Sequence, residues 1–186
     1  MRSLVIAALL GVAFVATPAQ AKPTKEQMRA DVRKMATQTL NRLYKVQPSA
    51  KQAVQNAAGY AVFSNFGMKI FVAGGGSGEG IAVDNRSGKE TFMKMAEVQA
   101  GLGFGVKKFR VIFVFDNSKV LDDFVNQGWE FGGQATASAK VEGKGTAYQG
   151  AMSAAPGVWM YQLTDQGLAA EVTAKGTKYY KDDALN

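Results

Sequence analysis

Apolar residues recur every three or four positions between residues 24 and 46, which is the spacing of one face of an α-helix. The residues on this face are Met28, Val32, Met35, Ala36, Thr39, Leu43 and Val46. Thr24 and Gln27 have the spacing of a capping box, in which a hydroxyl and an amide satisfy free N–H groups of the first turn. The pattern predicts one amphipathic helix over 24–46 and a second, short helix over 49–58.

From residue 60 onward the pattern changes to short apolar runs separated by glycine, which is typical of strands and turns. Residues 111–115 are all apolar, which indicates a central strand with both faces buried. A short helix is expected over 118–126, ended by Gly128. Strands are expected at 60–64, 70–73, 80–83, 91–95, 98–106, 110–115, 129–141, 158–163 and 168–173.

Five of the seven residues in 74–80 are glycine, and the strands expected on either side indicate a tight turn or bulge between them. A phosphate-binding P-loop needs glycines followed by lysine and then serine or threonine, and this motif is absent from the sequence. A dinucleotide-binding fingerprint needs a helix after the glycines, where a strand is expected instead. The glycines therefore predict local geometry and not nucleotide binding.

Together these elements predict an α+β fold with a mainly antiparallel, strongly curved or barrel-like sheet of about eight strands. The N-terminal amphipathic helix and one or two further short helices complete it. We expect a single domain over 22–186, in which 22–46 is the helix and 57–186 is a glycine-rich β core.

The first 21 residues have the three parts of a secretory signal peptide. Arg2 supplies the positive start, an apolar run follows over 4–15, and 19–21 has the small-x-small pattern of a cleavage site. A membrane span needs about 20 apolar residues, so a retained anchor is the less favoured alternative. We expect residues 1–21 to be removed and the mature chain to be exported, either periplasmic or secreted, and peripheral to a membrane if it contacts one.

The positive charge of the chain is concentrated near its expected mature N-terminus. The whole chain has a net charge of +7, and residues 22–51 carry eight basic and two acidic residues, a net +6. Residues 52–186 carry 13 basic and 13 acidic residues and are neutral. A neutral body with a basic N-terminal helix predicts an anionic partner for the helix.

The chain contains no His and no Cys, which removes several classes of chemistry. Catalytic triads with histidine, cysteine nucleophiles and zinc sites built from His or Cys are excluded. The neighbouring carboxylates Asp122 and Asp123 diverge by about 100° on a helix, so they cannot easily share a proton. We expect no enzymatic activity, no metal site and no cofactor.

The cations of the predicted helix have two interpretations. Arg29 and Arg33 lie along one margin of the apolar face, Arg42 lies near the other margin, and Lys34 lies on the far side. Long cationic side chains beside an apolar face can reach lipid phosphates while the apolar residues enter the headgroup boundary. Alternatively, the helix packs its apolar face on the domain and leaves its charges in water. Both interpretations hold if the helix docks reversibly.

A second, smaller basic cluster consists of Lys107, Lys108 and Arg110, at the junction of two expected strands. It is either a solvated turn or a second phosphate contact on the body of the domain.

The order of several short motifs over most of the chain resembles the SYLF domain family, which includes eukaryotic actin-patch proteins and many exported bacterial proteins. The motifs are 57–63 (AAGYAVF), 75–83 around Gly78, Glu79 and Gly80, 100–105 (AGLGFG), 111–115 with 121–124 (LDDF), 132–138 (GGQATAS) and 166–168 (QGL). The resemblance implies a lipid-binding module that prefers phosphoinositides, with an N-terminal amphipathic helix that helps membrane binding. Because this chain has an expected export signal, actin regulation is not carried over to it.

The residues and the resemblance together predict an exported module that binds phosphoinositide or other anionic phospholipid headgroups at a membrane surface. The alternative is an envelope module that binds or supports another protein without a lipid ligand. Nucleic acid is not an expected partner, because the chain carries an export signal. The membrane-facing apolar candidates are Met28, Val32, Met35 and Leu43. The candidate lipid-binding residues are Lys25, Arg29, Arg33, Lys34, Arg42, Lys107, Lys108 and Arg110.

Overall fold

The structure is a computed structural model, and it describes residues 22–70, 73–100, 105–131, 148–165, 167–168 and 176–186. The signal peptide expected over 1–21 lies outside these residues. The described elements are α1 (Lys25–Val46), α2 (Ser49–Asn56), β1 (Gly59–Ile70), β2 (Ala73–Asp84), β3 (Glu90–Ala100), β4 (Gly105–Phe115), α3 (Ser118–Gln127), β5 (Trp129–Phe131), β6 (Met152–Ala155), β7 (Val158–Thr164), β8 (Gly167–Leu168) and β9 (Thr177–Lys181).

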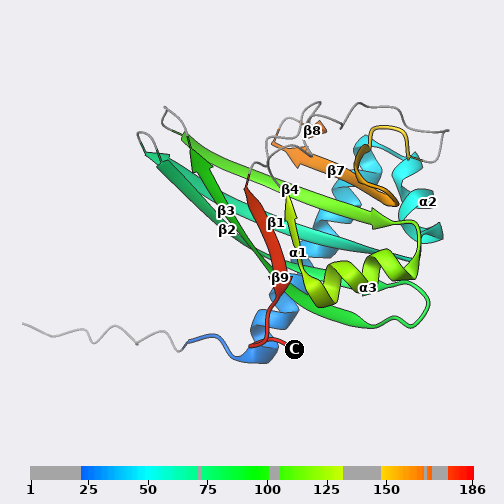
Figure 1. The fold of residues 1–186 in the computed structure, drawn as a ribbon, viewed down its shortest axis with the longest axis horizontal. Coiled ribbons are helices and arrows are strands. Elements are labelled where there is room, and N and C mark those ends of the chain that lie inside the picture. Colours follow the sequence, from blue (N-terminus) through cyan, green and yellow to red (C-terminus); the bar gives the residue numbers. More distant parts are fainter. Residues whose placement is uncertain (1–21, 71–72, 101–104, 132–147, 166, 169–175) are drawn as a thin grey trace, which may run out of the picture.

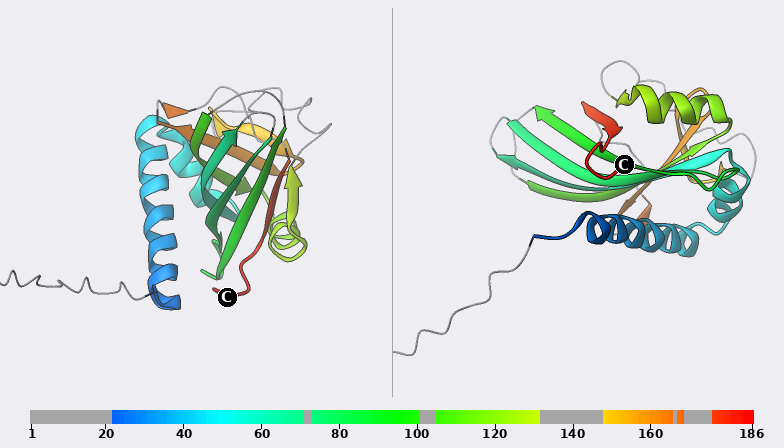
Figure 2. Two further views of the ribbon diagram at one scale, coloured as in Figure 1. Left: turned by 90° about the vertical axis from the view of Figure 1, so that its left-hand side faces the viewer. Right: turned by 90° about the horizontal axis from the view of Figure 1, so that it is seen from below.

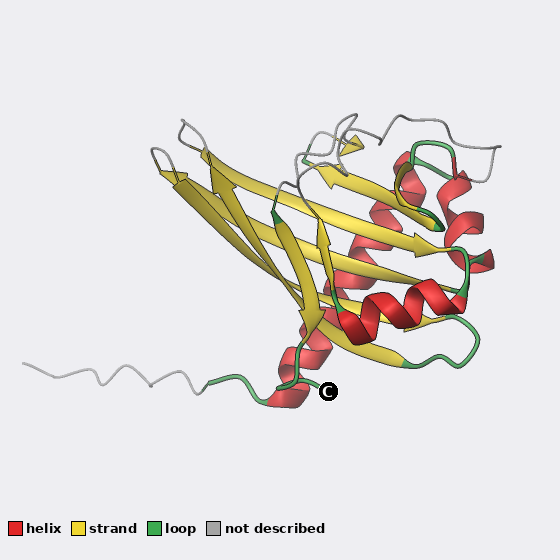
Figure 3. Ribbon diagram, viewed as in Figure 1, coloured by secondary structure: helices red, strands yellow, loops and turns green. Residues whose placement is uncertain are grey.

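One strongly curved sheet forms the centre of the fold (Figure 1). Its strand order is β5-β9-β3-β2-β1-β4-β7-β6, with β8 paired to β7, and every pair between described strands is antiparallel. Helix α1 lies across one face of the sheet and α3 across the other, as the two further views show (Figure 2). The α+β class and the curved antiparallel sheet predicted from the sequence are confirmed, and Figure 3 shows the strands between the helices.

The prediction of a tight turn or bulge over 74–80 is wrong, because this segment is the first half of β2 and pairs in continuous register. It pairs with β1 on one side and β3 on the other. A Cβ on Gly80 would collide with the Phe63 ring and lie 2.6 Å from the backbone oxygen of Val62. Gly80 is therefore needed where neighbouring strands approach closely inside the sheet, and not for a reversal of the chain.

Other strand boundaries also differ from the expectation. The prediction of one strand over 98–106 is wrong, because residues 98–100 end β3 and residues 105–106 begin β4. Residues 101–104 lie outside the described part. Most of the strand expected over 129–141, and residues 169–173 of the strand expected over 168–173, also lie outside it. Strands β6 and β9 were not expected, because they are short and their sequences, MSAA and TKYYK, do not clearly alternate apolar with polar residues.

Two apolar clusters lie on opposite faces of the sheet, and β4 contributes to both. Val111, Phe113 and Phe115 pack with Leu121 and Phe124 of α3. Ile112 and Val114 alternate with them and belong to the cluster on the α1 side. All five β4 side chains are fully buried, so the predicted central strand is confirmed. The cluster under α1 also contains Val32, Ala36, Leu43, Val62, Ile81, Phe92, Tyr161 and Leu163.

Candidate functional site

The capping box fixes where α1 begins, and its apolar face fixes its rotation against the sheet. Thr24 Oγ1 accepts a hydrogen bond from the Gln27 N–H at 3.2 Å, and Gln27 Oε1 accepts one from the Thr24 N–H at 2.7 Å. The predicted capping box is thus present. Because the apolar face points at the sheet, the cations beside it meet the rest of the protein along two margins.

One margin of α1 contacts the last residues of the chain. Lys25 Nζ donates to the backbone oxygen of Asn186 at 2.8 Å, and Arg29 Nε donates to that of Leu185 at 2.7 Å. The Asn186 side chain in turn accepts from the Phe92 N–H at 2.9 Å and donates to the Phe92 carbonyl at 2.8 Å. The last residues therefore link α1 to strand β3.

Farther along the same margin, Arg33 forms an ion pair with Glu90 at the start of β3. The Arg33 Nε and one terminal amino group both lie 2.7 Å from Glu90 Oε2. The hydrogen bond to Glu90 raises the pKa of Arg33 above its ordinary value. The guanidinium carbons of Arg29 and Arg33 lie 5.7 and 5.2 Å from the centre of the Phe92 ring, which is the range of cation–π contact. One buried ring thus holds two guanidinium groups next to each other.

The opposite margin of α1 is fixed by Arg42. One terminal amino group of Arg42 donates to the backbone oxygens of Thr164 and Asp165, at 2.6 and 3.0 Å. Arg42 therefore anchors the C-terminal half of the helix to the end of β7.

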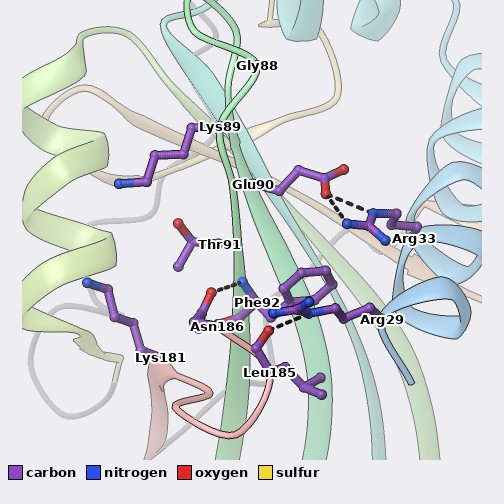
Figure 4. Close-up of a pocket in the computed structure, with 10 residues that line it drawn as sticks. All are labelled: Arg29, Arg33, Gly88, Lys89, Glu90, Thr91, Phe92, Lys181, Leu185 and Asn186. Atoms are coloured by element: carbon purple, nitrogen blue, oxygen red, sulfur yellow. Dashed lines mark hydrogen bonds and ion pairs between the residues drawn. The ribbon is translucent and has the colours of Figure 1, made fainter. Parts of the chain in front are cut away.

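A cavity of about 530 Å³ opens where α1, the start of β3 and the last residues meet (Figure 4). We call it the basic cavity, because four cationic side chains and a single carboxylate side chain line it among the described residues. The residues that define its charge and its floor are Arg29, Arg33, Lys89, Lys181, Glu90 and Phe92.

The cations of the basic cavity lie on two sides of β3. Figure 4 shows Arg29 and Arg33 reaching in from α1 on one side, with Lys89 and Lys181 on the other. Lys181 Nζ donates to Asn126 Oδ1 of α3 at 2.8 Å. The structure therefore brings Arg29 and Arg33 together with two lysines that the sequence analysis did not select.

The remaining predicted cations do not line this cavity. Lys34 is exposed on the outer side of α1, and among the described residues it has no hydrogen bond or ion pair. Lys107 and Lys108 lie in β4, but their side chains are outside the described part. The buried Arg110 Nε has no hydrogen-bond partner among the described atoms.

The four apolar candidates on α1 pack on the protein in this structure. Val32 and Leu43 are buried, and Met28 and Met35 are half-buried against the same cluster. Of the two arrangements considered for this face, the structure shows the docked one.

The residues of the site that the sequence analysis missed are Lys89, Glu90, Phe92, Lys181 and Asn186. They come from a strand start and from the end of the chain, and their meeting depends on the sheet order. The only local signal was the charge of the adjacent pair Lys89 and Glu90 after a turn.

Neither a metal site nor a membrane-spanning helix is found in the described part of the chain. No group of three or more carboxylate, His or Cys side chains there has the arrangement of a metal site. No helix within those ranges has the length and apolar character needed to cross a bilayer.

Comparison with known proteins identifies relatives of this chain. The sequence profile of the Ysc84 family, described as "Las17-binding protein actin regulator", matches residues 96–186. Beta cell expansion factor A of Aeromonas veronii is 33% identical over 164 residues, which cover 87% of this chain. The chain spans about 60% of the length of that relative. These matches and the motif order agree, and the chain belongs to the SYLF (Ysc84) domain family.

Proposed function

We propose that this protein is exported and binds anionic phospholipid at a membrane surface through the face formed by α1 and the basic cavity. Its family is associated with lipid binding. The observation that carries the proposal is the placement of charge, since the entire net charge of 22–186 lies in residues 22–51. In the structure most of that segment is a helix on the outside of the sheet (Figure 2).

The docked helix favours adsorption by charge over insertion of its apolar face. Val32 and Leu43 are inside the protein, so inserting them into lipid would first require breaking the contacts of Arg29, Arg33 and Arg42. Lys34 and Lys45 are exposed and lie three turns apart on the outer side of α1. A cation close to an anionic bilayer contributes about 1 kcal/mol of binding. Lys34 and Lys45 are therefore the outer contacts, and the basic cavity lies beside them.

Vesicle co-sedimentation tests this proposal. The mature chain should sediment with phosphatidylglycerol-containing vesicles at low salt, sediment less at high salt, and not sediment with pure phosphatidylcholine. Lys34→Gln combined with Lys45→Gln should weaken binding about tenfold or more, because two contacts are removed. Arg86→Gln combined with Lys119→Gln removes the same charge near α3 and is the matched control.

Equal loss in both double variants would show that only net charge matters and would overturn the role given to α1. No sedimentation of the parent protein would overturn lipid binding and favour the envelope-protein partner. Export is checked separately: the mass of the protein recovered from the periplasm or medium should correspond to a chain that begins at Lys22.

A further inference from the structure

We infer that the basic cavity is a specific phosphate site, in which Arg29 and Arg33 bind a phosphate monoester and Glu90 competes with it for Arg33. This deepens the proposed function, on which it rests if the phosphate belongs to a lipid headgroup. The same chemistry would bind a soluble phosphate ester, so the experiment has one arm for each source.

The first argument is the charge left unpaired at Arg29. Its Nε donates to the neutral carbonyl of Leu185, and among the described residues its terminal amino groups have no hydrogen-bond partner. Arg29 and Arg33 are four residues apart on one helix, a spacing at which like charges repel. Both nevertheless lie over the Phe92 ring, and among the described residues Glu90 is the single carboxylate side chain that faces them. An anion in the cavity would relieve this repulsion.

The second argument is the geometry of the two guanidinium groups. A guanidinium offers parallel N–H donors that match two oxygens of a phosphate. Arg29 is fixed at Nε by Leu185, and both groups rest on a side chain that is only 4% exposed. The donors are therefore positioned before a ligand arrives, which lowers the entropic cost of binding. The volume of about 530 Å³ is within the usual range for small-ligand sites and accommodates a headgroup phosphate.

The third argument concerns Glu90. Its Oε2 takes both Arg33 contacts, in the position that a phosphate oxygen would take. The Glu90 side chain is 34% exposed and the Arg33 side chain 49%, and exposed ion pairs contribute about 1 kcal/mol or less. Glu90 can therefore rotate away without a large loss of stability.

The arginine side of β3 is the better phosphate site of the two. Lys89 on the other side also lines a small hollow with Asp84 and Asp122, which oppose an anion there. Lys89 and Lys181 raise the positive potential of the basic cavity without taking the phosphate themselves.

Calorimetric titration with glycerol 3-phosphate, together with sedimentation on phosphatidic acid vesicles, tests the inference on the full mature chain. Three variants are compared: Arg29→Gln with Arg33→Gln, Glu90→Gln, and the Arg86→Gln and Lys119→Gln control. The arginine double variant should bind glycerol 3-phosphate about tenfold or more weakly, the Glu90 variant a few-fold more tightly, and the control as the parent does. The opposite signs of the first two effects separate a binding role from general damage to the fold.

The outcomes distinguish the site from the proposed function. Glycerol 3-phosphate binding with this pattern but no vesicle binding would keep the site, assign it to a soluble phosphate ester and overturn the lipid function. Vesicle binding that none of the variants changes, with no glycerol 3-phosphate binding, would overturn the site and leave lipid binding through Lys34 and Lys45 alone. A Glu90→Gln protein that binds more weakly than the parent would overturn the competition.

Discussion

Replacing Leu43 by alanine tests whether α1 is an integral part of the fold. Leu43 is fully buried in the cluster between α1 and the sheet, where Val62 and Ile112 also lie. If α1 were an arm that only rests on the surface, this change would leave the unfolding of the sheet almost unaffected.

The expected cost follows from the burial of the side chain. Leucine to alanine removes three carbons, each worth about 0.8 kcal/mol of transfer free energy, or about 2.4 kcal/mol in total. The space left behind adds to this, so the measured loss should fall within about 2–5 kcal/mol. For a chain of this length each kcal/mol lowers the melting temperature by about 2–4 °C. The variant should therefore melt roughly 5–20 °C below the parent.

Urea and thermal unfolding followed by circular dichroism would measure the effect. Val46→Ala is the matched control, because Val46 ends the same helix and is 44% exposed. It should change the free energy of unfolding by no more than about 0.5 kcal/mol. A Leu43→Ala protein that unfolds like Val46→Ala would refute the docked arrangement of α1, and with it the geometry of the basic cavity.

Three further predictions follow from other parts of the structure. Tyr161→Phe should raise stability by up to about 1 kcal/mol, because it removes a buried hydroxyl with no hydrogen-bond partner among the described atoms; a large loss in urea unfolding would contradict this. Gly80→Ala should cost about 1–3 kcal/mol by collision with β1, whereas Gly75→Ala places its methyl 3.5 Å from the nearest atom and should cost much less; equal urea midpoints would refute the close approach. Burial raises the pKa of Tyr44 and of Tyr161 from 10.0 to about 12. The folded state therefore favours the neutral phenols, and their contribution to the free energy of unfolding is complete below pH 10 and is lost as pH rises toward 12. The urea midpoint of unfolding should fall between pH 10 and pH 12. A midpoint that does not change with pH, together with all tyrosinate absorbance titrating near pH 10, would disprove the raised pKa values.

The elements with local signals were predictable from the sequence. The capping box and apolar period of α1 fix both its start and the face it buries, and neither depends on distant residues. The central strand β4 could be predicted for a similar reason, since five consecutive apolar residues leave no exposed face. The glycines of 74–80 misled because glycine marks both turns and close contacts between strands, and only the sheet order separates the two cases.

The candidate site was predictable in part. The position of Arg29 and Arg33 on the helix margin marked them as candidates. The sequence did not predict the residues that they contact. Arg29 contacts a residue 156 positions away and Arg33 one 57 positions away, and single-sequence patterns do not report such pairings. Free, solvated cations and cations that anchor a helix have the same sequence pattern.

The contacts between α1 and the end of the chain constrain the order of folding. Lys25 and Arg29 bond to backbone oxygens of Asn186 and Leu185, so the first helix is completed by the last two residues. A chain that leaves a ribosome or an export channel N-terminus first must wait for those residues before this margin closes. Contacts over such sequence separations form late, because a long loop must close first. During that interval the first turns of α1 lack their link to β3, and the basic cavity is open on the side that Leu185 and Asn186 later close.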